Sequence, residues 1–321
     1  MPNFYPLETV LRTAPLGLRC MDIATQAQVS GGLSITATPT NGRGKTVPAF
    51  VTRSGIYAFQ GLPGLHDFEY GIGQTFQTSP PASPPGQEFA IRVEDALGNY
   101  LPWSMALTLP RSEVLTTWLF SAPKRAGVPG FMVIRGGLKD TTRRRADGTL
   151  RPAAFARISA EYEVTSPPTA YVALADWRGE FALFLPAPNP LQRPAGETVT
   201  SPNTTGRKTI SQLRWPVTLS FFYQPEKQRF ICADARAQIK IIEGQQEGLT
   251  DNAPTAASER RCVPELVSLL MQGAAEMLPG VTLPAAAALE AEIEFGKDVV
   301  VRTDGSTDSC VWLVPPTIVS P

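Results

Sequence analysis

Hydrophobic and polar residues alternate with a period of two in several short stretches of the chain. The clearest is 33–39, where Leu33, Ile35 and Ala37 alternate with small polar residues, and 89–95 repeats the alternation. A period of two places successive side chains on opposite faces of a strand, so it predicts half-buried strands. Glycine, asparagine and proline lie between these stretches and predict turns. With shorter runs at 16–22, 47–51, 56–59 and 105–110, the first part of the chain fits an antiparallel β-sandwich.

The pattern begins again after residue 122. Further strands are predicted at 131–136, 155–162, 171–176, 180–186, 217–223, 229–233, 291–295, 299–302 and 310–314. One helix is predicted at about 264–278, where leucine and alanine residues share a face and Pro279-Gly280 follows. The predicted fold is therefore mainly β, with two tandem antiparallel β-sandwich (Ig/transthyretin-like) domains at residues 1–122 and 123–321. The second domain is expected to carry long loops, the helix and a C-terminal hairpin.

The two predicted domains share a set of spaced anchor residues. Ile35 lies 20 residues before Gly55, and Ile158 lies 21 residues before Gly179. Each glycine is followed by an aromatic residue at the second position, a bulky apolar residue at the fourth and a closing Leu-Pro. This spacing indicates two related modules. We interpret Gly55, Gly64 and Gly179 as structural turns, and expect positive φ before the aromatic strand in each module.

Composition agrees with a chain of short strands. The 321 residues include 31 prolines and 26 glycines, which leave few places for a long helix. Hydrophobic residues make up 43% of the chain, enough for a substantial core. The length is more than one typical domain needs.

Charge and terminal sequence narrow the function classes. The 29 basic and 29 acidic residues balance, so we expect no nucleic-acid partner. The run 143–145 precedes an Asp-Gly pair and is interpreted as a solvated hairpin turn, with a phosphate or acidic-partner contact as the alternative. The first eight residues do not resemble a signal peptide, and no apolar run approaches the ~20 residues of a bilayer span. These features predict a cytoplasmic protein without direct membrane insertion.

Four cysteines are spread along the sequence without a CxxC pair. They are Cys20, Cys232, Cys262 and Cys310. A metal site requires clustered ligands, and secreted disulfide scaffolds are shorter and richer in cysteine. Free buried thiols are the prediction, although pairing between them stays open.

Candidate catalytic and ligand-binding residues are few. His66 lies beside Asp67, but successive strand residues would point to opposite faces, and no nucleophile is near them in sequence. The segment 42–46 ends like a phosphate-binding loop but leads into a predicted strand. The segment 304–308 alternates oxygen-bearing side chains that could contribute to a calcium site, short of a full ligand set. We therefore predict no catalytic residue, no cofactor and no metal ligand, and expect that the protein is not an enzyme.

Three loops, at 73–88, 187–212 and 244–262, are longer than a β-sandwich requires. The middle loop carries Arg193, Arg207 and Lys208 against one acidic residue, and its prolines limit the entropy lost on docking. We therefore interpret this loop, with its three basic residues, as the candidate partner-binding loop. A disordered connector is the alternative.

The segment Thr52-Arg53-Ser54-Gly55-Ile56-Tyr57-Ala58-Phe59-Gln60-Gly61-Leu62-Pro63-Gly64 resembles carboxypeptidase-regulatory-like (transthyretin-like) β-sandwich modules. Their hallmark is a (S/T/D)-x-x-G turn, an aromatic-bearing strand and a closing Leu-Pro-x-Gly, and the segment 176–186 repeats most of it. This resemblance implies spacer, stalk or adhesive modules without catalysis.

The whole layout also resembles accessory proteins of phage-tail-like contractile injection systems, with the segment 295–302 as the C-terminal part of the likeness. That resemblance implies a non-catalytic, baseplate- or fibre-associated subunit whose partners are other proteins of a large particle. The alternative is a stand-alone carbohydrate- or surface-binding β-sandwich protein.

Overall fold

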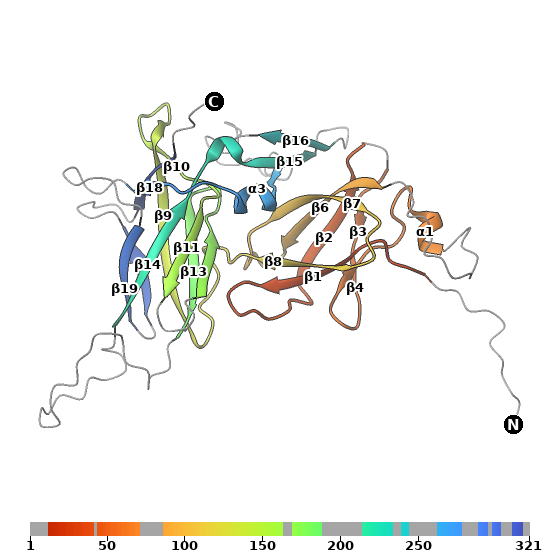
Figure 1. Cartoon of the computed structure of the whole chain (residues 1–321), viewed down its shortest axis with the longest axis horizontal. Helices are drawn as coiled ribbons and strands as arrows, with labels where there is room; N and C mark the ends of the chain where they lie inside the picture. Colours follow the sequence, from red (N-terminus) through yellow and green to blue (C-terminus); the bar gives the residue numbers. More distant parts are fainter. Residues whose placement is uncertain are drawn as a thin grey trace, which may run out of the picture.

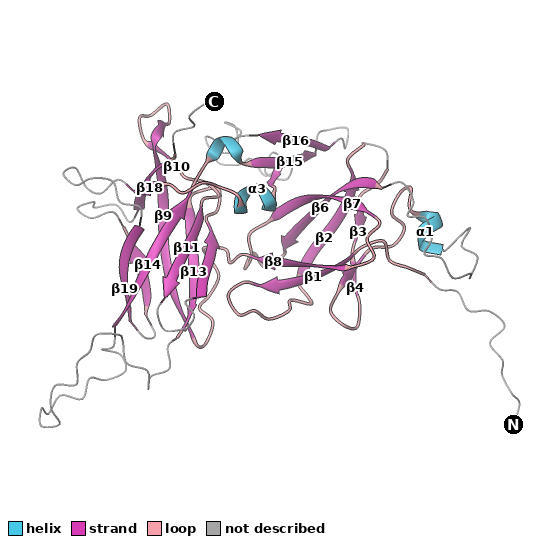
Figure 2. Ribbon diagram, in the orientation of Figure 1, coloured by secondary structure: helices cyan, strands magenta, loops and turns pink. Residues whose placement is uncertain are grey.

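The computed structural model describes residues 12–41, 44–70, 86–162, 169–187, 214–233, 239–243, 262–277, 288–294, 297–302 and 310–316. These residues form several β-sheets and two short α-helices (Figures 1 and 2). The chain is therefore mainly β, as the alternating pattern predicts. Within the described ranges, no helix has the length and apolar character needed to cross a bilayer.

Two four-stranded sheets in the first part of the chain share one core, and we call them the N-terminal sheet pair. One sheet has the order β4-β5-β1-β8 and the other β3-β2-β6-β7. The strands are β1 (Gly17–Asp22), β2 (Leu33–Pro39), β3 (Val47–Pro48), β4 (Phe50–Val51), β5 (Tyr57–Ala58), β6 (Gln87–Asp95), β7 (Trp103–Leu109) and β8 (Val114–Leu119). Ile35, Tyr57 and Phe89 meet in the core between the sheets, because alternate side chains of each strand point inward.

A second pair of sheets, the C-terminal sheet pair, encloses its own core around Ile158, Phe181 and Trp215. Its strands are β9 (Phe131–Arg144), β10 (Leu150–Pro152), β11 (Arg157–Tyr162), β12 (Thr169–Leu174), β13 (Glu180–Pro186), β14 (Arg214–Phe222), β19 (Ala288–Glu294), β20 (Asp298–Val301) and β21 (Cys310–Val314). One sheet has the order β12-β11-β14-β19, and the facing sheet is built around β9, which pairs with β10, β13, β20 and β21.

The two sheet pairs repeat one strand order. In the first, β1 pairs antiparallel with β5 and parallel with β8. In the second, β9 pairs antiparallel with β13 and parallel with β20 and β21. The facing sheets, β3-β2-β6-β7 and β12-β11-β14-β19, also correspond strand by strand. The anchor residues Ile35 and Ile158 lie on corresponding strands, β2 and β11, and both are buried.

One segment of the second half has no counterpart in the first. Between β14 and β19 lie η2 (Pro225–Lys227), β15 (Arg229–Ala233), β16 (Ile239–Glu243), β17 (Cys262–Pro264), α3 (Leu266–Leu270) and β18 (Glu276–Met277), which we call the insert. The strands β15 to β17 and the helix α3 of the insert lie over the junction of the two sheet pairs (Figure 1), whereas β18 returns to the C-terminal sheet pair, where it pairs with β21. Leu266 and Leu269 enter the N-terminal core, and the Ser104 hydroxyl on β7 donates to the carbonyl oxygens of Val263 and Pro264 at 3.0 and 3.1 Å. The insert therefore joins the two halves.

Several sequence-based predictions are wrong in detail. The helix predicted at about 264–278 is only α3, because β17 takes the start of the segment and Ala275 donates its N–H to the Phe221 carbonyl in a strand-like contact. The sheets are not wholly antiparallel, since first and last strands pair in parallel. That long-range pairing also explains β8, which weak alternation did not reveal.

The prediction of a C-terminal hairpin is also wrong. The strands β20 and β21 do not pair with each other in the described residues but follow one another along β9, with Val301 beside Gly136 and Cys310 beside Gly137. The strand β19 belongs to the facing sheet, where it pairs with β14. The end of the chain therefore crosses between sheets instead of folding back on itself.

Candidate functional site: a cleft between the sheet pairs

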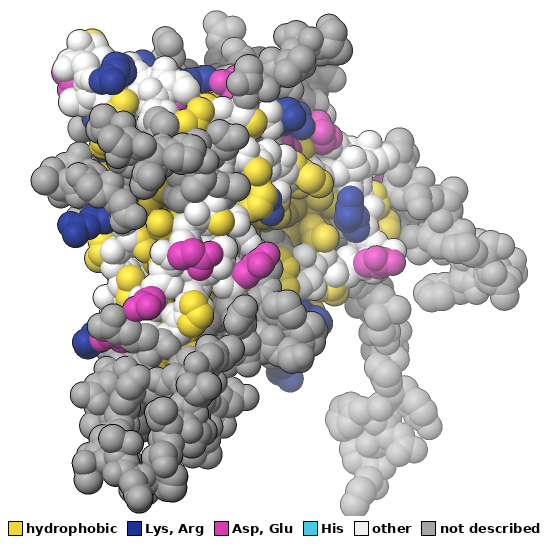
Figure 3. All heavy atoms as spheres, turned by 60° about the vertical axis from the view of Figure 1, so that its left-hand side comes forward, with side chains coloured by type: hydrophobic (Ala, Val, Ile, Leu, Met, Phe, Trp, Pro, Cys, Tyr) yellow, Lys and Arg dark blue, Asp and Glu magenta, His cyan; other side chains and the backbone are white. Residues whose placement is uncertain are grey.

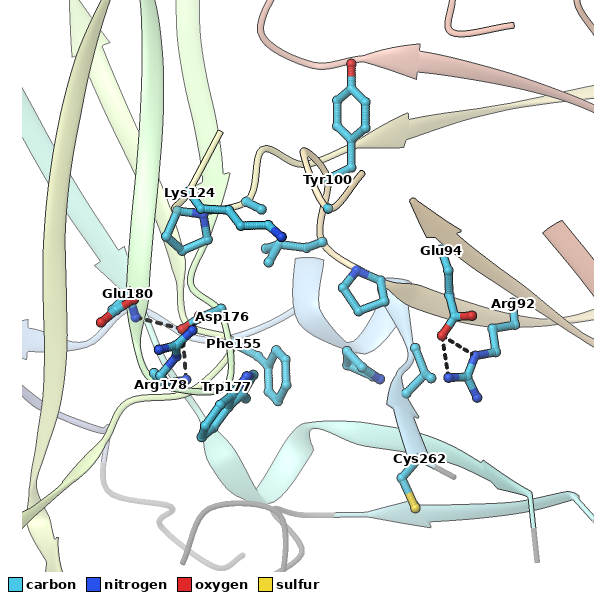
Figure 4. A pocket seen from close by; sticks show the side chains of 17 residues that line it. Arg92, Glu94, Tyr100, Lys124, Phe155, Asp176, Trp177, Arg178, Glu180 and Cys262 are labelled. Carbon is cyan, nitrogen blue, oxygen red and sulfur yellow. Dashed lines mark hydrogen bonds and ion pairs between the residues drawn. The ribbon is translucent and has the colours of Figure 1, made fainter. Parts of the chain in front are cut away.

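A cleft of about 360 Å³ lies where the two sheet pairs and the insert meet. Its walls come from β6, the loop 98–102, the linker 122–124, the turn 176–180 and β17. The lining is mostly apolar, with a few charged side chains, a composition typical of ligand sites. Figure 4 shows the Arg92–Glu94 pair on one side and the turn 176–180 on the other, where Phe155 lies next to Trp177.

The turn 176–180 is held by its own hydrogen bonds. The Asp176 Oδ1 atom accepts the N–H groups of Arg178 at 2.8 Å and Glu180 at 3.0 Å, and the Asp176 N–H donates to the Glu180 carbonyl at 2.7 Å. Gly179 has a φ of 78°, and a side chain there would collide with the Leu138 carbonyl oxygen. Burial raises the pKa of Asp176 despite the two backbone hydrogen bonds. The turn therefore presents Trp177 on a rigid support.

Two aromatic side chains, Phe155 and Trp177, lie next to each other in the cleft (Figure 4), and we call them its aromatic floor. The Arg178 guanidinium lies 5.1 Å from the centre of the Trp177 ring, and its Nε atom lies 3.6 Å from Asp176 Oδ2. Phe155 has a φ of 58°, which is unusual for a bulky residue and stores backbone strain. The Gln272 amide compensates by donating to the Phe155 carbonyl at 2.7 Å. The insert thus stabilises a strained aromatic residue in the cleft.

The opposite wall belongs to the N-terminal sheet pair. Arg92 and Glu94 lie on one face of β6, and the Arg92 Nε atom donates to Glu94 Oε1 at 3.0 Å. The next loop is fixed by Asp95, whose Oδ2 atom accepts the N–H groups of Asn99 and Tyr100 at 2.6 and 3.2 Å. This wall therefore offers an ordered donor and acceptor pair beside an ordered loop.

A buried ion pair fixes the linker between the walls. Arg125 donates to both carboxylate oxygens of Asp22, at 3.0 and 2.6 Å, and its guanidinium lies 4.9 Å from the Tyr100 ring and 5.0 Å from the Phe184 ring. Burial disfavours a charged Asp22, but the hydrogen bonds from Arg125 and Thr25 outweigh it and hold the Asp22 pKa below its usual value. The ion pair ties Asp22 of β1 to Arg125, whose guanidinium also lies against Phe184 of β13, so it helps to hold the two sheet pairs together.

A disulfide crosses the insert at the edge of the cleft. Cys232 on β15 and Cys262 on β17 face each other across paired strands and are bonded. The prediction of free thiols is wrong for these two residues, since the pairing of distant strands brings together cysteines 30 residues apart. Cys20 and Cys310 are free of disulfides, and burial raises the pKa of the Cys20 thiol to about 12.

The residues singled out in the sequence have different places. Gly55, Gly64 and Gly179 have φ values of 75°, 79° and 78°, and only Gly179 lies within a turn whose other residues line the cleft. The loop residues Arg193, Arg207 and Lys208, and the segment 304–308, lie outside the described residues.

His66 was placed on a strand, but it begins the helix α1 (His66–Tyr70) because the chain turns at Gly64 and the buried Glu69 carboxylate accepts the N–H groups of Gly61 and Leu62. The His66 and Asp67 side chains are both exposed and lie 3.7 Å apart. The basic run 143–145 ends β9 and enters the hairpin turn, where Arg143 pairs with Glu226 at 2.6 Å.

Sequence reasoning missed the cleft residues Phe155 and Trp177. One signal was present: Trp177 occupies the turn position that Arg53 occupies in the first module. An aromatic residue at an exposed turn position has no role in the local fold and indicates a contact elsewhere.

Among the described residues, no group of three or more histidine, cysteine or acidic side chains could hold a metal ion. Figure 3 shows basic and acidic side chains interspersed over the face that it presents.

Comparisons with known proteins add little. No family model matches the chain, and no curated protein matches it. A solved structure described as a "putative adhesin" from Bacteroides ovatus is similar over 78% of this chain and 93% of that chain, with 10% identity and a TM-score of 0.20. A score this low carries no argument about fold or function. The resemblances to carboxypeptidase-regulatory-like modules and to contractile-particle subunits stay predictions.

Proposed function

We propose that this protein is a non-catalytic carbohydrate-binding protein made of two tandem β-sandwich modules. The observation that carries the proposal is the cleft, in which aromatic side chains and ordered charged pairs line one space between rigidly joined parts. The repeated strand order supports the tandem modules, in line with the resemblance to carboxypeptidase-regulatory-like sandwiches.

The cleft matches the chemistry of a sugar ring. A pyranose has apolar C–H faces that stack on aromatic rings, and Phe155 and Trp177 supply such rings. Its rim carries hydroxyl groups that both donate and accept hydrogen bonds. The Arg92–Glu94 and Arg178–Asp176 pairs offer donors and acceptors already held in place, which lowers the entropy lost on binding.

Two of the three carboxylates of the cleft, Asp176 and Glu94, have structural roles that fit binding better than catalysis. Asp176 closes its turn as Thr52 closes the corresponding turn in the first module, where the Thr52 hydroxyl accepts the Ile56 N–H at 3.1 Å. Glu94 is held by Arg92 in a direct hydrogen bond. A general acid or base would need freedom to reach a substrate proton.

The disulfide bears on where the protein acts. Disulfides persist in oxidising compartments and are rare in the reducing cytosol. We therefore replace the cytoplasmic expectation with a proposal that the protein acts at a cell surface or outside the cell, where a glycan-binding cleft meets its ligands.

A matched pair of tryptophan variants tests the proposal. The wild type is screened on a glycan array, and hits are measured by titration calorimetry. Trp177→Ala should weaken binding at least about 10-fold, because stacking and apolar burial are lost. Trp118→Ala removes an exposed tryptophan on β8, outside the cleft lining, and should bind as the wild type does. Absence of any glycan ligand, or equal affinities for the two variants, would refute the proposal.

A second candidate function is the predicted subunit of a phage-tail-like particle. The observation that favours it is β8, an edge strand of six uncharged residues with Val114 45% and Trp118 40% exposed. Edge strands without charges or prolines readily pair with another chain. In native lysate the wild type should then sediment in a megadalton fraction, whereas Trp118→Lys should not. The control Val300→Lys changes a residue on β20 that is 57% exposed. Sedimentation of the wild type as a small species would remove this candidate.

A further inference from the structure

We infer that the cleft selects sugars bearing one anionic group, and that the Lys124 ammonium recognises it. This inference rests on the proposed carbohydrate binding and names the class of sugar. Two independent features carry it: the balance of charges in the lining, and the way in which the fold positions the Lys124 side chain.

Two of the three basic residues that line the cleft are paired with a carboxylate, and Lys124 is the third. Arg92 binds Glu94 at 3.0 Å, and Arg178 lies 3.6 Å from Asp176. Within the ranges that the structure describes, Lys124 has no ion pair, and it extends between the two walls of the cleft (Figure 4). Glu180, the remaining acidic residue of the lining, lies beside Asp176 on the far wall. The Lys124 ammonium is therefore the cation of the lining that is left to bind a ligand between the walls.

The backbone around Lys124 is clamped from both sides. The Arg135 guanidinium donates to the Arg125 carbonyl at 2.8 Å and also to the Pro123 carbonyl. The backbone N–H of Arg125 donates to the Ala122 carbonyl oxygen at 3.0 Å, and the Arg125 side chain is held in the ion pair with Asp22. Lys124 thus lies within a short segment that the junction of the two halves holds in place.

Gly98 leaves room for the Lys124 amine. The glycine has a φ of 65°, and a Cβ atom built on it would collide with Lys124 Nζ and Cε. The amine therefore lies against bare backbone in a loop that Asp95 fixes through the Asn99 and Tyr100 N–H groups. Fewer conformations are open to this side chain than to a free surface lysine, so less entropy is lost when it binds an anion.

The acidic residues limit how much negative charge the ligand can carry. The lining contains Glu94, Asp176 and Glu180 besides its three basic residues. A densely sulfated chain would bring several negative charges close to these carboxylates, and like charges repel. A single carboxylate on a sugar ring, as in a uronic or sialic acid, needs only Lys124 and leaves the ring free to stack on the aromatic floor.

The test uses sugars in matched charged and neutral forms. Oligogalacturonate, hyaluronan oligosaccharides and sialyllactose are each compared with their carboxyl methyl esters, which keep the rings and hydroxyls but lose the charge. Binding to the full chain is measured by titration calorimetry in low salt (about 50 mM), where electrostatic attraction is least screened. At least one acid should bind about 5- to 10-fold more tightly than its ester, a size expected of one partly exposed charge pair.

Lysine variants assign the effect to its residue. Lys124→Met keeps the aliphatic stem and should bind acid and ester equally, at the affinity of the wild type for the ester. Lys45→Met removes an exposed lysine outside the cleft lining and should keep the preference for the acid.

The outcomes separate the two proposals. Equal binding of acid and ester by the wild type would overturn the inference and leave carbohydrate binding intact. Retention of the preference in Lys124→Met would overturn the role of Lys124. Binding of none of these sugars, together with an empty glycan array, would overturn both.

Discussion

The turns at 52–56 and 176–180 are closed by the same backbone hydrogen bonds but have different surroundings. In both, the N–H of the first residue donates to the carbonyl of the fifth, and the glycine N–H donates to the carbonyl of the first, at 2.9 Å in one turn and 3.0 Å in the other. The first turn lies at the surface, where Gln28 donates to the Ser54 carbonyl. The second turn faces the N-terminal sheet pair and the insert across the cleft. One local motif thus serves as a plain turn in one module and as a wall of a candidate site in the other.

The difference arises from the junction and not from the turns. The insert and the Arg125–Asp22 pair both hold the two halves together, and neither has a counterpart at the turn 52–56. If this interpretation is correct, changes at the junction should have larger effects than changes within either turn.

The largest effect is expected from Arg125→Met. The substitution leaves the Asp22 carboxylate buried without its partner, at a cost of about 3–5 kcal/mol in the free energy of unfolding, measured by denaturant titration. The double variant Asp22→Asn/Arg125→Met removes both charges and should recover part of the loss. A single variant within about 1 kcal/mol of the wild type would show that the junction does not depend on this pair.

Removal of the disulfide should have the next largest effect. Cys232→Ser/Cys262→Ser opens a loop of 30 residues, for which chain entropy gives about 3–4 kcal/mol. Thermal unfolding of the wild type should shift to lower temperature on reduction, whereas the double variant should not respond to reductant. Mass spectrometry of alkylated native protein gives an independent check, and four free thiols there would contradict the assignment.

Alanine at each turn glycine sharpens the comparison directly. At Gly179 a Cβ would meet the Leu138 backbone oxygen, which cannot move away, so Gly179→Ala should cost about 3 kcal/mol. At Gly55 a Cβ would meet Gln28 Nε2 and Ser30 Cβ, each at 2.7 Å. The Gln28 amide can rotate away, and Ser30 lies in an exposed segment whose backbone can shift more easily than a paired strand. Gly55→Ala should therefore cost less, about 2 kcal/mol, for its positive φ and this smaller displacement. Equal losses in denaturant titrations would mean that surroundings do not distinguish the turns.

The smallest effect is expected from Asp176→Asn, and it should depend on pH. Asparagine keeps the acceptor oxygen of the turn but not the charge. Because burial raises the folded-state pKa of Asp176, its contribution to stability is fully present below the unfolded pKa and is lost as pH rises through the folded pKa. The variant should thus gain stability over the wild type as pH rises above about 4. Thr52→Val in the first turn should show no such pH dependence.

Local pattern was sufficient for many strands of the fold, although not for β8. The alternation at 33–39 appears as alternating burial along β2, and the strands at 180–186 and 229–233 have the predicted limits. The spacing of Ile35 and Ile158 to their glycines reflects corresponding strands in facing sheets. Such features depend on neighbours within about 20 residues, so the sequence alone determines them.

The candidate site depended on contacts between distant parts of the chain. Phe155 and Trp177 become cleft residues only because the insert enters the N-terminal core, and Lys124 points between the walls only because the junction fixes its backbone. The disulfide and the parallel pairing of β1 with β8 are likewise long-range. Periodicity and turn signals show which face of a strand is buried and where the strand ends. They do not show which other element packs on that face, because this depends on the free energy of packing the whole chain. That choice placed a turn of one module against the other and made the cleft.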